Sequence, residues 1–231
     1  MPYLYLLLNL GSLIIPFLFS FHPKLKFYKL WKALFIAIPA SMLIFIPWDI
    51  YFTLKGFWGF NLNYFLGPKL FNLPIEEWLF FICIPYACVF THYALLHYFP
   101  QLKLSIKPTK RIGLLLTFGF LFISIYHYNK CYTFVNFLLA SLLIAVVSRS
   151  KPQLLQSYFL TFLVMLIPFF IVNGILTGSF IANEVVWYNH YENLNFRLFT
   201  IPIEDSVYAF TLILLNLFII SLLKPKAKQL F

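Results

Sequence analysis

The residues best suited to chemistry in this chain are its carboxylates, because a carboxylic acid can donate a proton and a carboxylate can accept one. Only seven occur among 231 residues. They are Asp49, Glu76, Glu77, Glu184, Glu192, Glu204 and Asp205. Four of them form two adjacent pairs, Glu76-Glu77 and Glu204-Asp205, and each pair follows the dipeptide Pro-Ile. The two pairs are therefore candidates for acid/base chemistry.

Each pair also has the composition of a helix start, with proline in the opening turn and carboxylates where the helix dipole favours negative charge. The structural and the chemical interpretation are both open at this point. Neighbouring helix positions point about 100° apart, so one carboxyl of each pair can face the interior of a helix bundle while the other faces a loop. The sequence does not decide which one faces inward. An inward carboxyl in a dry environment can hold a proton and serve as an acid.

The elements that position these acids are predicted to be transmembrane helices. The chain is 62% hydrophobic, 22% aromatic and only 10% charged, far more apolar than a soluble domain. Crossing a hydrocarbon layer takes about 20 apolar residues, and seven runs without acidic or basic side chains reach or approach this length. They extend over Tyr3–Phe21, Ala33–Trp48, Trp78–Phe99, Ile112–Tyr128, Tyr132–Ser148, Leu154–Leu176 and Val207–Leu223. Because these runs lack a period of two, helices are expected and a barrel is not.

The basic loops predict the orientation of these helices. Thirteen of the 17 lysines and arginines follow the first, third, fifth and seventh runs, and the last group is Lys224, Lys226 and Lys228. Loops rich in Lys and Arg stay in the cytoplasm, so the N-terminus is expected outside and the C-terminus in the cytoplasm. Anionic lipid headgroups facing these loops account for the net charge of +10, and no nucleic acid partner is expected. All seven carboxylates would then lie on the outer side, at span ends or in loops.

The chain also contains an internal repeat. The segment 73–77 (LPIEE) matches the segment 201–205 (IPIED), 128 positions later. Upstream in the two copies, Asp49 corresponds to Asn173, and a threonine follows each of them four residues later. Two copies of one unit predict two similar half-sites.

The repeat completes the predicted fold, an all-α integral membrane protein with seven transmembrane helices. Two parallel repeats of three helices are joined by one linker helix in a 3+1+3 arrangement. The predicted domains are residues 1–99 for the first repeat, 100–130 for the linker helix and 131–231 for the second repeat.

Asp49 has two interpretations, either a solvated residue at a helix end or a charge partner that keeps a glutamate protonated. Asn173 is its neutral counterpart, so the two halves would be unequal. Trp48 and Trp58 suit either a membrane interface or a cavity in which aromatic ring faces stabilise a developing cation.

Four motifs follow one another along the chain. They are PWDxxxT at 47–53, PIEEWLFF at 74–81, NxxxTG at 173–178 and PIEDxVYAF at 202–210. In this order they resemble the membrane-embedded lycopene cyclases, and specifically the fused form of the heterodimeric type, over nearly the whole chain. The resemblance implies an intramolecular lyase or isomerase that converts the acyclic ψ-ends of lycopene into β-ionone rings without net redox change.

The matched motifs imply particular residues. The implied catalytic residues are Asp49, Glu76, Glu77, Glu204 and Asp205. The implied substrate-binding residues are Trp48, Thr53, Trp58, Asn173, Thr177 and Tyr208. Cyclisation needs an acid that protonates a terminal double bond, a dry pocket that guides the carbocation and a base that removes a ring proton.

The resemblance also implies the surroundings of the protein: lycopene as substrate, the bilayer of a bacterial cytoplasmic (inner) membrane, and other carotenoid-pathway enzymes as candidate partners. No cofactor and no metal ion are expected, because the chain has no GxG and no metal-ligand spacing. The alternatives are a small-molecule transporter and a carotenoid-binding membrane protein without catalysis. A retinal-binding protein is disfavoured, because none of the seven runs contains a lysine for a Schiff base.

Overall fold

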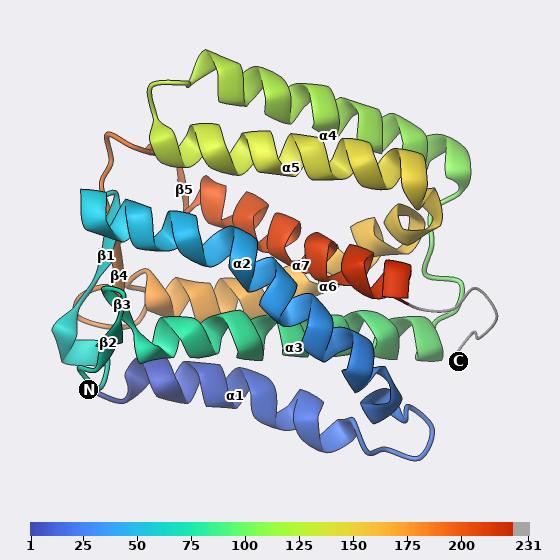
Figure 1. Ribbon diagram of the computed structural model, residues 1–231, viewed down its shortest axis with the longest axis horizontal. Helices are drawn as coiled ribbons and strands as arrows, with labels where there is room; N and C mark the ends of the chain where they lie inside the picture. The colour runs from blue at the N-terminus through green and yellow to red at the C-terminus, as the bar shows by residue number, and fades with distance from the viewer. Residues whose placement is uncertain (224–231) are drawn as a thin grey trace.

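The computed structural model describes residues 1–223, and its helices lie side by side along one direction (Figure 1). The seven α-helices are α1 Leu4–Phe19, α2 Trp31–Lys55, α3 Ile75–Tyr98, α4 Ile106–Tyr126, α5 Cys131–Ser150, α6 Pro152–Leu176 and α7 Ile203–Leu223. Two short 3-10 helices, η1 Phe27–Leu30 and η2 Leu62–Tyr64, lie in the connections. The predicted cytoplasmic lysines Lys224, Lys226 and Lys228 lie outside the described residues.

Six of these helices, α2 to α7, are long and apolar enough to cross a membrane. The first helix, α1, is apolar but has only 16 residues, which give it a length of about 24 Å. Many large apolar side chains point outward, among them Leu43 with 78% and Leu115 with 72% of their surface exposed. Such a surface is stable against lipid and not against water, so the helices imply a membrane environment.

The helix boundaries differ from the predicted spans around the acidic residues. The second helix, α2, continues to Lys55, where Gly56 ends it with a φ of 70°. Asp49 therefore lies within α2. The sequence had predicted it at the end of this helix, and that prediction is wrong. Likewise α3 begins at Ile75 and includes Glu76 and Glu77 in its first turn. The predicted spans stopped at the first charged side chain, whereas the backbone stays helical through it.

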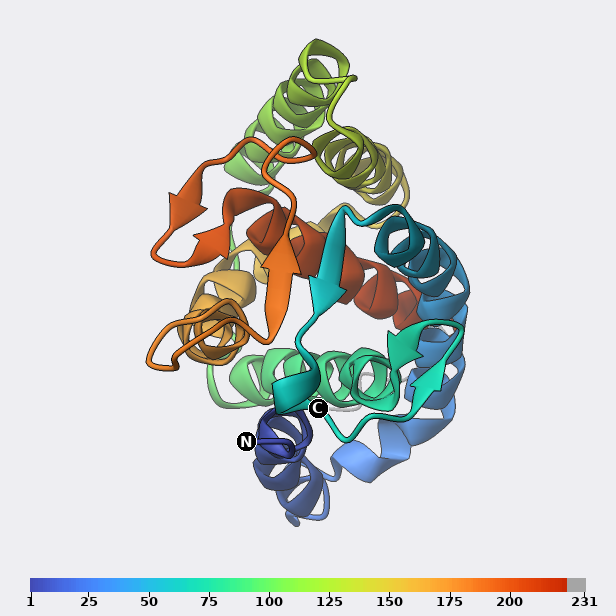
Figure 2. The ribbon, with the colours of Figure 1, turned by 90° about the vertical axis from the view of Figure 1, so that its left-hand side faces the viewer.

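The helices pack in the same order in the two halves of the chain. Helix α1 packs against α3, and α5 packs against α7. Between the halves, α2 contacts α7 and α3 contacts α6. Helix α4 lies at the edge of the bundle, where it packs mainly on α5 (Figure 2). The main apolar core lies among α2, α3, α6 and α7, and α5 also contributes to it.

Three two-stranded antiparallel sheets gather at one end of the bundle, where they face the viewer in Figure 2. They pair β1 Trp58–Phe60 with β4 Val186–Tyr188, β2 Lys69–Leu70 with β3 Leu73–Pro74, and β5 Arg197–Leu198 with β6 Ile201–Pro202. The last two sheets are hairpins that lead directly into α3 and α7. The first sheet joins the two halves, because its strands come from different repeats.

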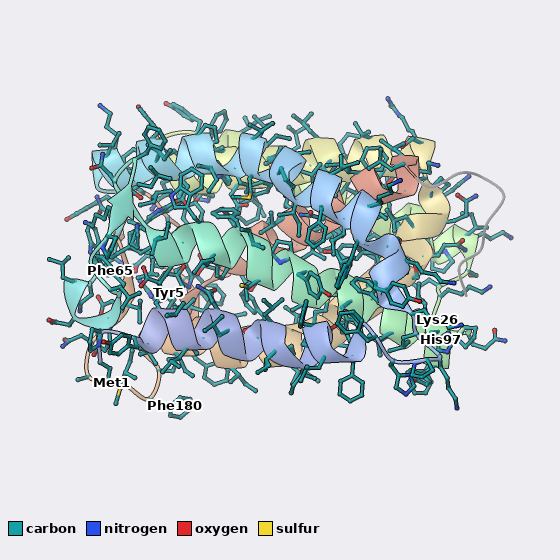
Figure 3. All side chains as sticks on the ribbon, turned by 60° about the horizontal axis from the view of Figure 1, so that its bottom comes forward. Met1, Tyr5, Lys26, Phe65, His97 and Phe180 are labelled. Carbon is teal, nitrogen blue, oxygen red and sulfur yellow. The ribbon has the colours of Figure 1, made fainter. Side chains whose placement is uncertain are left out.

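The strands and the acidic pairs lie at the same end of the molecule. Tyr5 and Phe65 lie at this end in Figure 3, whereas Lys26 and His97 lie at the opposite end. The basic loop after α1 and the acidic pairs are thus separated by the length of the bundle. The sidedness of the membrane stays a prediction from the basic loops.

Candidate active site

A cavity of about 440 Å³ extends from the strand end of the bundle past its middle, between α1, α3, α6 and α7. Its wall is mostly aliphatic and aromatic. Three carboxylates interrupt this wall, Asp49 from α2, Glu77 from α3 and Asp205 from α7, and they are 2%, 9% and 6% exposed. Three of the seven acids of the chain therefore converge on one mostly apolar pocket.

The first half-site consists of Asp49 and Glu77. The indole Nε1 of Trp58 donates a hydrogen bond of 2.8 Å to Oδ1 of Asp49. The hydroxyl of Tyr5 donates to Oε2 of Glu77. Oδ2 of Asp49 is buried and has no hydrogen-bond partner among the described residues. The two carboxyls interact electrostatically with one another, so this half-site contains two acids and only two donors.

The second half-site consists of Asp205 and three donors. The hydroxyl of Tyr132 donates a hydrogen bond of 2.6 Å to Oδ1 of Asp205. Nδ2 of Asn173 and the hydroxyl of Tyr188 each donate a hydrogen bond of 2.9 Å to Oδ2. Burial and the nearby Asp205 raise the pKa of Tyr188 well above its ordinary value, so its hydroxyl stays a donor at neutral pH. The carboxyl of Asp205 also interacts electrostatically with Glu77, which links the two half-sites.

The other member of each acidic pair points away from the cavity. Glu76 is fully buried and its Oε1 accepts a 2.8 Å hydrogen bond from the backbone N–H of Leu66. Glu204 is equally buried, and its Oε1 accepts two hydrogen bonds of 2.7 Å, one from the N–H of Leu194 and one from the hydroxyl of Thr133. Both side chains thus bind the long segments that precede α3 and α7. Neither lines the cavity.

Two asparagines, which the sequence analysis did not identify, anchor the starts of α3 and α7. Nδ2 of Asn9 donates a hydrogen bond of 2.8 Å to the carbonyl oxygen of Glu76. Nδ2 of Asn136 donates a hydrogen bond of 2.6 Å to the carbonyl oxygen of Glu204. Each asparagine follows, four residues later, the tyrosine that donates to the cavity carboxylate of its half. A Tyr-x-x-x-Asn pattern that occurs in two apolar runs was the signal that could have identified these residues.

The predicted substrate-binding residues fall into two groups. Trp58, Asn173 and Tyr208 line the cavity together with the three carboxylates. Trp48, Thr53 and Thr177 do not line it. The ring of Trp48 stacks on Tyr208, with 5.4 Å between ring centroids. The hydroxyl of Thr177 lies 2.8 Å from that of Thr200, and the hydroxyl of Thr53 is buried without a hydrogen-bond partner among the described residues.

Aromatic rings surround the carboxylates. Trp58 meets Tyr132 edge to face at 4.9 Å between ring centroids, and Tyr132 stacks on Tyr188 at 5.9 Å. Tyrosine and tryptophan ring faces attract cations. The cavity therefore combines carboxyl groups, which can hold or accept a proton, with rings that can stabilise positive charge on an apolar molecule.

The donors to the three carboxylates are all neutral groups: an indole, phenols and an amide. In residues 1–223, no group of three His, Cys, Asp or Glu side chains is arranged to hold a metal ion.

Comparisons with known proteins all indicate the same family. A family model described as lycopene cyclase matches residues 2–95 and 129–223. Three fungal relatives are each named bifunctional lycopene cyclase/phytoene synthase. The protein of Pyrenophora tritici-repentis is 38% identical over 66 residues, which are 29% of this chain and 11% of the relative. Those of Leptosphaeria maculans and Podospora anserina are 35% and 37% identical over 63 and 49 residues, which are 27% and 21% of this chain.

The aligned segments cover 10% and 8% of the latter two relatives, so each match spans only about a tenth of a relative's length. No solved structure matches the chain. Because the relatives are fungal, they give no support to the predicted bacterial membrane. The two segments that match the family model contain all three cavity carboxylates, five complete α-helices and most of α3. The chain belongs to the lycopene cyclase family.

Proposed function

We propose that this chain is a lycopene cyclase that forms β-ionone rings at the ψ-ends of lycopene by proton-initiated cyclisation within a membrane. The observation that carries the proposal is the convergence of Asp49, Glu77 and Asp205 on one apolar cavity. Family membership supports the substrate class. The reaction is an isomerisation, because one proton enters the substrate and another leaves it.

The first half-site is the proposed acid. In the second half, the amide of Asn173 donates to Asp205, and the position of Asn173 in the repeat is taken by Asp49 in the first half. A carboxyl next to Glu77 in place of an amide gives the first half two groups that can share one proton. Glu77, which faces the cavity, would donate that proton to the terminal double bond.

The second half-site is the proposed base. Asp205 accepts three hydrogen bonds, a pattern that fits an acceptor-only carboxylate. After the terminal double bond has been protonated, the next double bond attacks the tertiary cation and closes a six-membered ring. Asp205 would then take a proton from the ring, which leaves a ring double bond and restores neutrality in the substrate.

Two groups of residues would support this reaction without transferring protons. Glu76 and Glu204 would hold the segments that cover the cavity, because each binds a backbone N–H of its own segment. Trp58, Tyr132 and Tyr188 would stabilise the carbocation and exclude water, which would otherwise trap it.

The finer architecture belongs to the same proposal. We propose the 3+1+3 arrangement, with repeats at 1–99 and 131–231 and the linker helix in 100–130, the N-terminus outside and the acids at the outer face. The equivalent hydrogen bonds of Asn9 and Asn136 in the two halves support the repeat. The host membrane and any partner enzymes follow from the resemblance alone.

The test compares neighbouring carboxylates in a lycopene-accumulating bacterium. Glu77→Gln and Asp205→Asn are expected to abolish β-carotene formation, whereas Glu76→Gln and Glu204→Gln retain it, because glutamine can still accept the backbone hydrogen bond. The pigments are extracted and separated by chromatography, with membrane expression measured for each variant. Normal ring formation in both Glu77→Gln and Asp205→Asn would refute the assignment. Unchanged lycopene in cells that express the wild-type chain would favour a transporter or a binding protein instead.

A further inference from the structure

The cavity opens sideways, between α1 and α6, on the apolar surface of the bundle. Its lining includes Leu7 and Ile15 of α1, which are each 62% exposed. Gly11 lies between them on the same helix, and a Cβ built at this glycine meets no other atom within 4 Å. From this opening the same cavity reaches inward to the carboxylates. A lipid-soluble molecule at the bundle surface could thus reach the acids without entering water.

A second hollow, of about 280 Å³, lies between α2 and α5. It is lined only by Ile44, Trp48, Val135, Leu138, Leu139 and Leu142. None of these residues is acidic, so this hollow does not reach the carboxylates.

The two hollows are equivalent in the internal repeat. In the repeat, Asp49 and Asn173 are 124 positions apart, and Tyr5 and Tyr132 are 127 positions apart. When these two offsets are applied to α2 and α5, every residue that lines the second hollow corresponds to a residue that lines the first. The pairs are Ile44 with Pro168, Trp48 with Val172, Val135 with Leu8, Leu138 with Gly11, Leu139 with Ser12, and Leu142 with Ile15. The chain thus has one groove in each half.

Side-chain size decides which groove is continuous with the acids. Gly11 and Val172 line the open groove, and their counterparts in the second groove are Leu138 and Trp48. The indole of Trp48 stacks on Tyr208, and Tyr208 itself lines the acid cavity. Trp48 and Tyr208 therefore form a wall between the second groove and the carboxylates.

We infer that the α1–α6 groove is the entrance through which a carotenoid chain passes from the bilayer to the carboxylates, kept open by Gly11 and Val172, while its counterpart between α2 and α5 is sealed by Leu138 and Trp48. The inference rests on the proposed function. A polyene is the occupant because the groove is apolar along its length and ends at the aromatic rings and acids that the cyclisation uses. A cavity of 440 Å³ is the size of a site for a drug-sized molecule, so it holds one end of the carotenoid while the rest stays in the groove and the lipid.

A single open groove sets the order of the reaction. Because the acids are reached from one side, the two ends of lycopene are cyclised one after the other. The molecule with one ring must leave and re-enter with its other end first. A product with a single ring is therefore expected as a free intermediate in the early phase of the reaction.

The test fills the open groove with the residues of the sealed one. Gly11→Leu and, independently, Val172→Trp are expected to abolish ring formation in membranes that contain lycopene. Each change is also combined with Glu77→Gln, and the lycopene that copurifies with each double variant is measured. We expect the double variants to copurify without lycopene. The matched control is Gly119→Leu in α4, because Gly119 is also an exposed helix glycine with no other atom within 4 Å of a built Cβ. The control should keep both ring formation and bound lycopene.

Three outcomes separate the possibilities. If Gly11→Leu and Val172→Trp, at wild-type membrane levels, form rings as fast as Gly119→Leu, the entrance is elsewhere and the inference is wrong. If they bind lycopene normally but form no rings, the residues act within the site and the entrance is again refuted. If the wild-type chain forms no rings but binds lycopene, the proposed function fails, and loss of binding in Gly11→Leu still supports the entrance.

Discussion

At the scale of single residues, the difference between the two halves is concentrated in one pair of equivalent positions. Asp49 and Asn173 occupy the same place in the repeat, and both lie beside the cavity carboxylate of their half. An amide offers Asp205 a donor, whereas a carboxyl offers Glu77 a second site for a proton. In the proposed mechanism, this one replacement suits the first half to donate a proton and the second half to accept one.

Replacing Asp49 with asparagine should therefore remove the acid while the structure is kept. Asparagine still offers an oxygen to the indole of Trp58, so the fold should tolerate Asp49→Asn. Loss of a general acid lowers a rate by about 10² to 10⁴-fold, and a loss of this size is expected in β-carotene formation by purified protein in liposomes loaded with lycopene. An Asp49→Asn protein with normal turnover would assign the acid to Glu77 alone.

At the scale of elements, the β1–β4 sheet connects the two halves above the acids. Gly59 lies opposite Trp187 in this sheet, and a Cβ at Gly59 would lie 2.3 Å from the indole ring. The neighbouring pair, Trp58 and Tyr188, donates to Asp49 and Asp205. The close approach at Gly59 therefore sets the position of two donors, one in each half-site.

The change Gly59→Ala is expected to push the strands apart and to move Trp58 from Asp49. The cost should be about 1–3 kcal/mol of stability, as for other overpacked sites, with a loss of activity in parallel. The ring of Trp187 is 39% exposed, so Trp187→Ala alone should cost little. The double variant Gly59→Ala/Trp187→Ala should recover both properties. Thermal unfolding in detergent and pigment assays measure them, and a double variant as impaired as Gly59→Ala would show that the clash is not the cause.

Much of this arrangement of elements could be predicted from the sequence, and the failures have physical causes. Long apolar runs and the repeated PIE motif are strong signals, and they located the helices and the acids. The strands have two or three residues each, too few for a recognisable alternation. The choice between Glu76 and Glu77 depends on the N–H of Leu66, ten residues earlier, and a loop contact of this kind leaves no local pattern.

At the scale of the whole molecule, the cavity exists only when both halves are present. Asp49 and Glu77 come from the first half, and Asp205 with its donors Asn173 and Tyr188 comes from the second. The halves meet where α2 packs on α7 and α3 packs on α6. By contrast, the connection between α3 and α4 is a short exposed segment, and α4 packs mainly on α5. We therefore expect that the cavity can form without a peptide bond between α3 and α4.

The chain should therefore remain active when it is cut between α3 and α4. We expect fragments 1–99 and 100–231 to form β-carotene when they are produced together in a lycopene-accumulating host, because their apolar contact faces can pair within the membrane. Each fragment alone should leave lycopene unchanged, since neither contains both the proposed acid and the proposed base. Co-purification through a tag on one fragment checks assembly, and pigment analysis checks the reaction. Ring formation by either fragment alone would show that one half carries a complete site, and it would overturn the division of roles between Glu77 and Asp205.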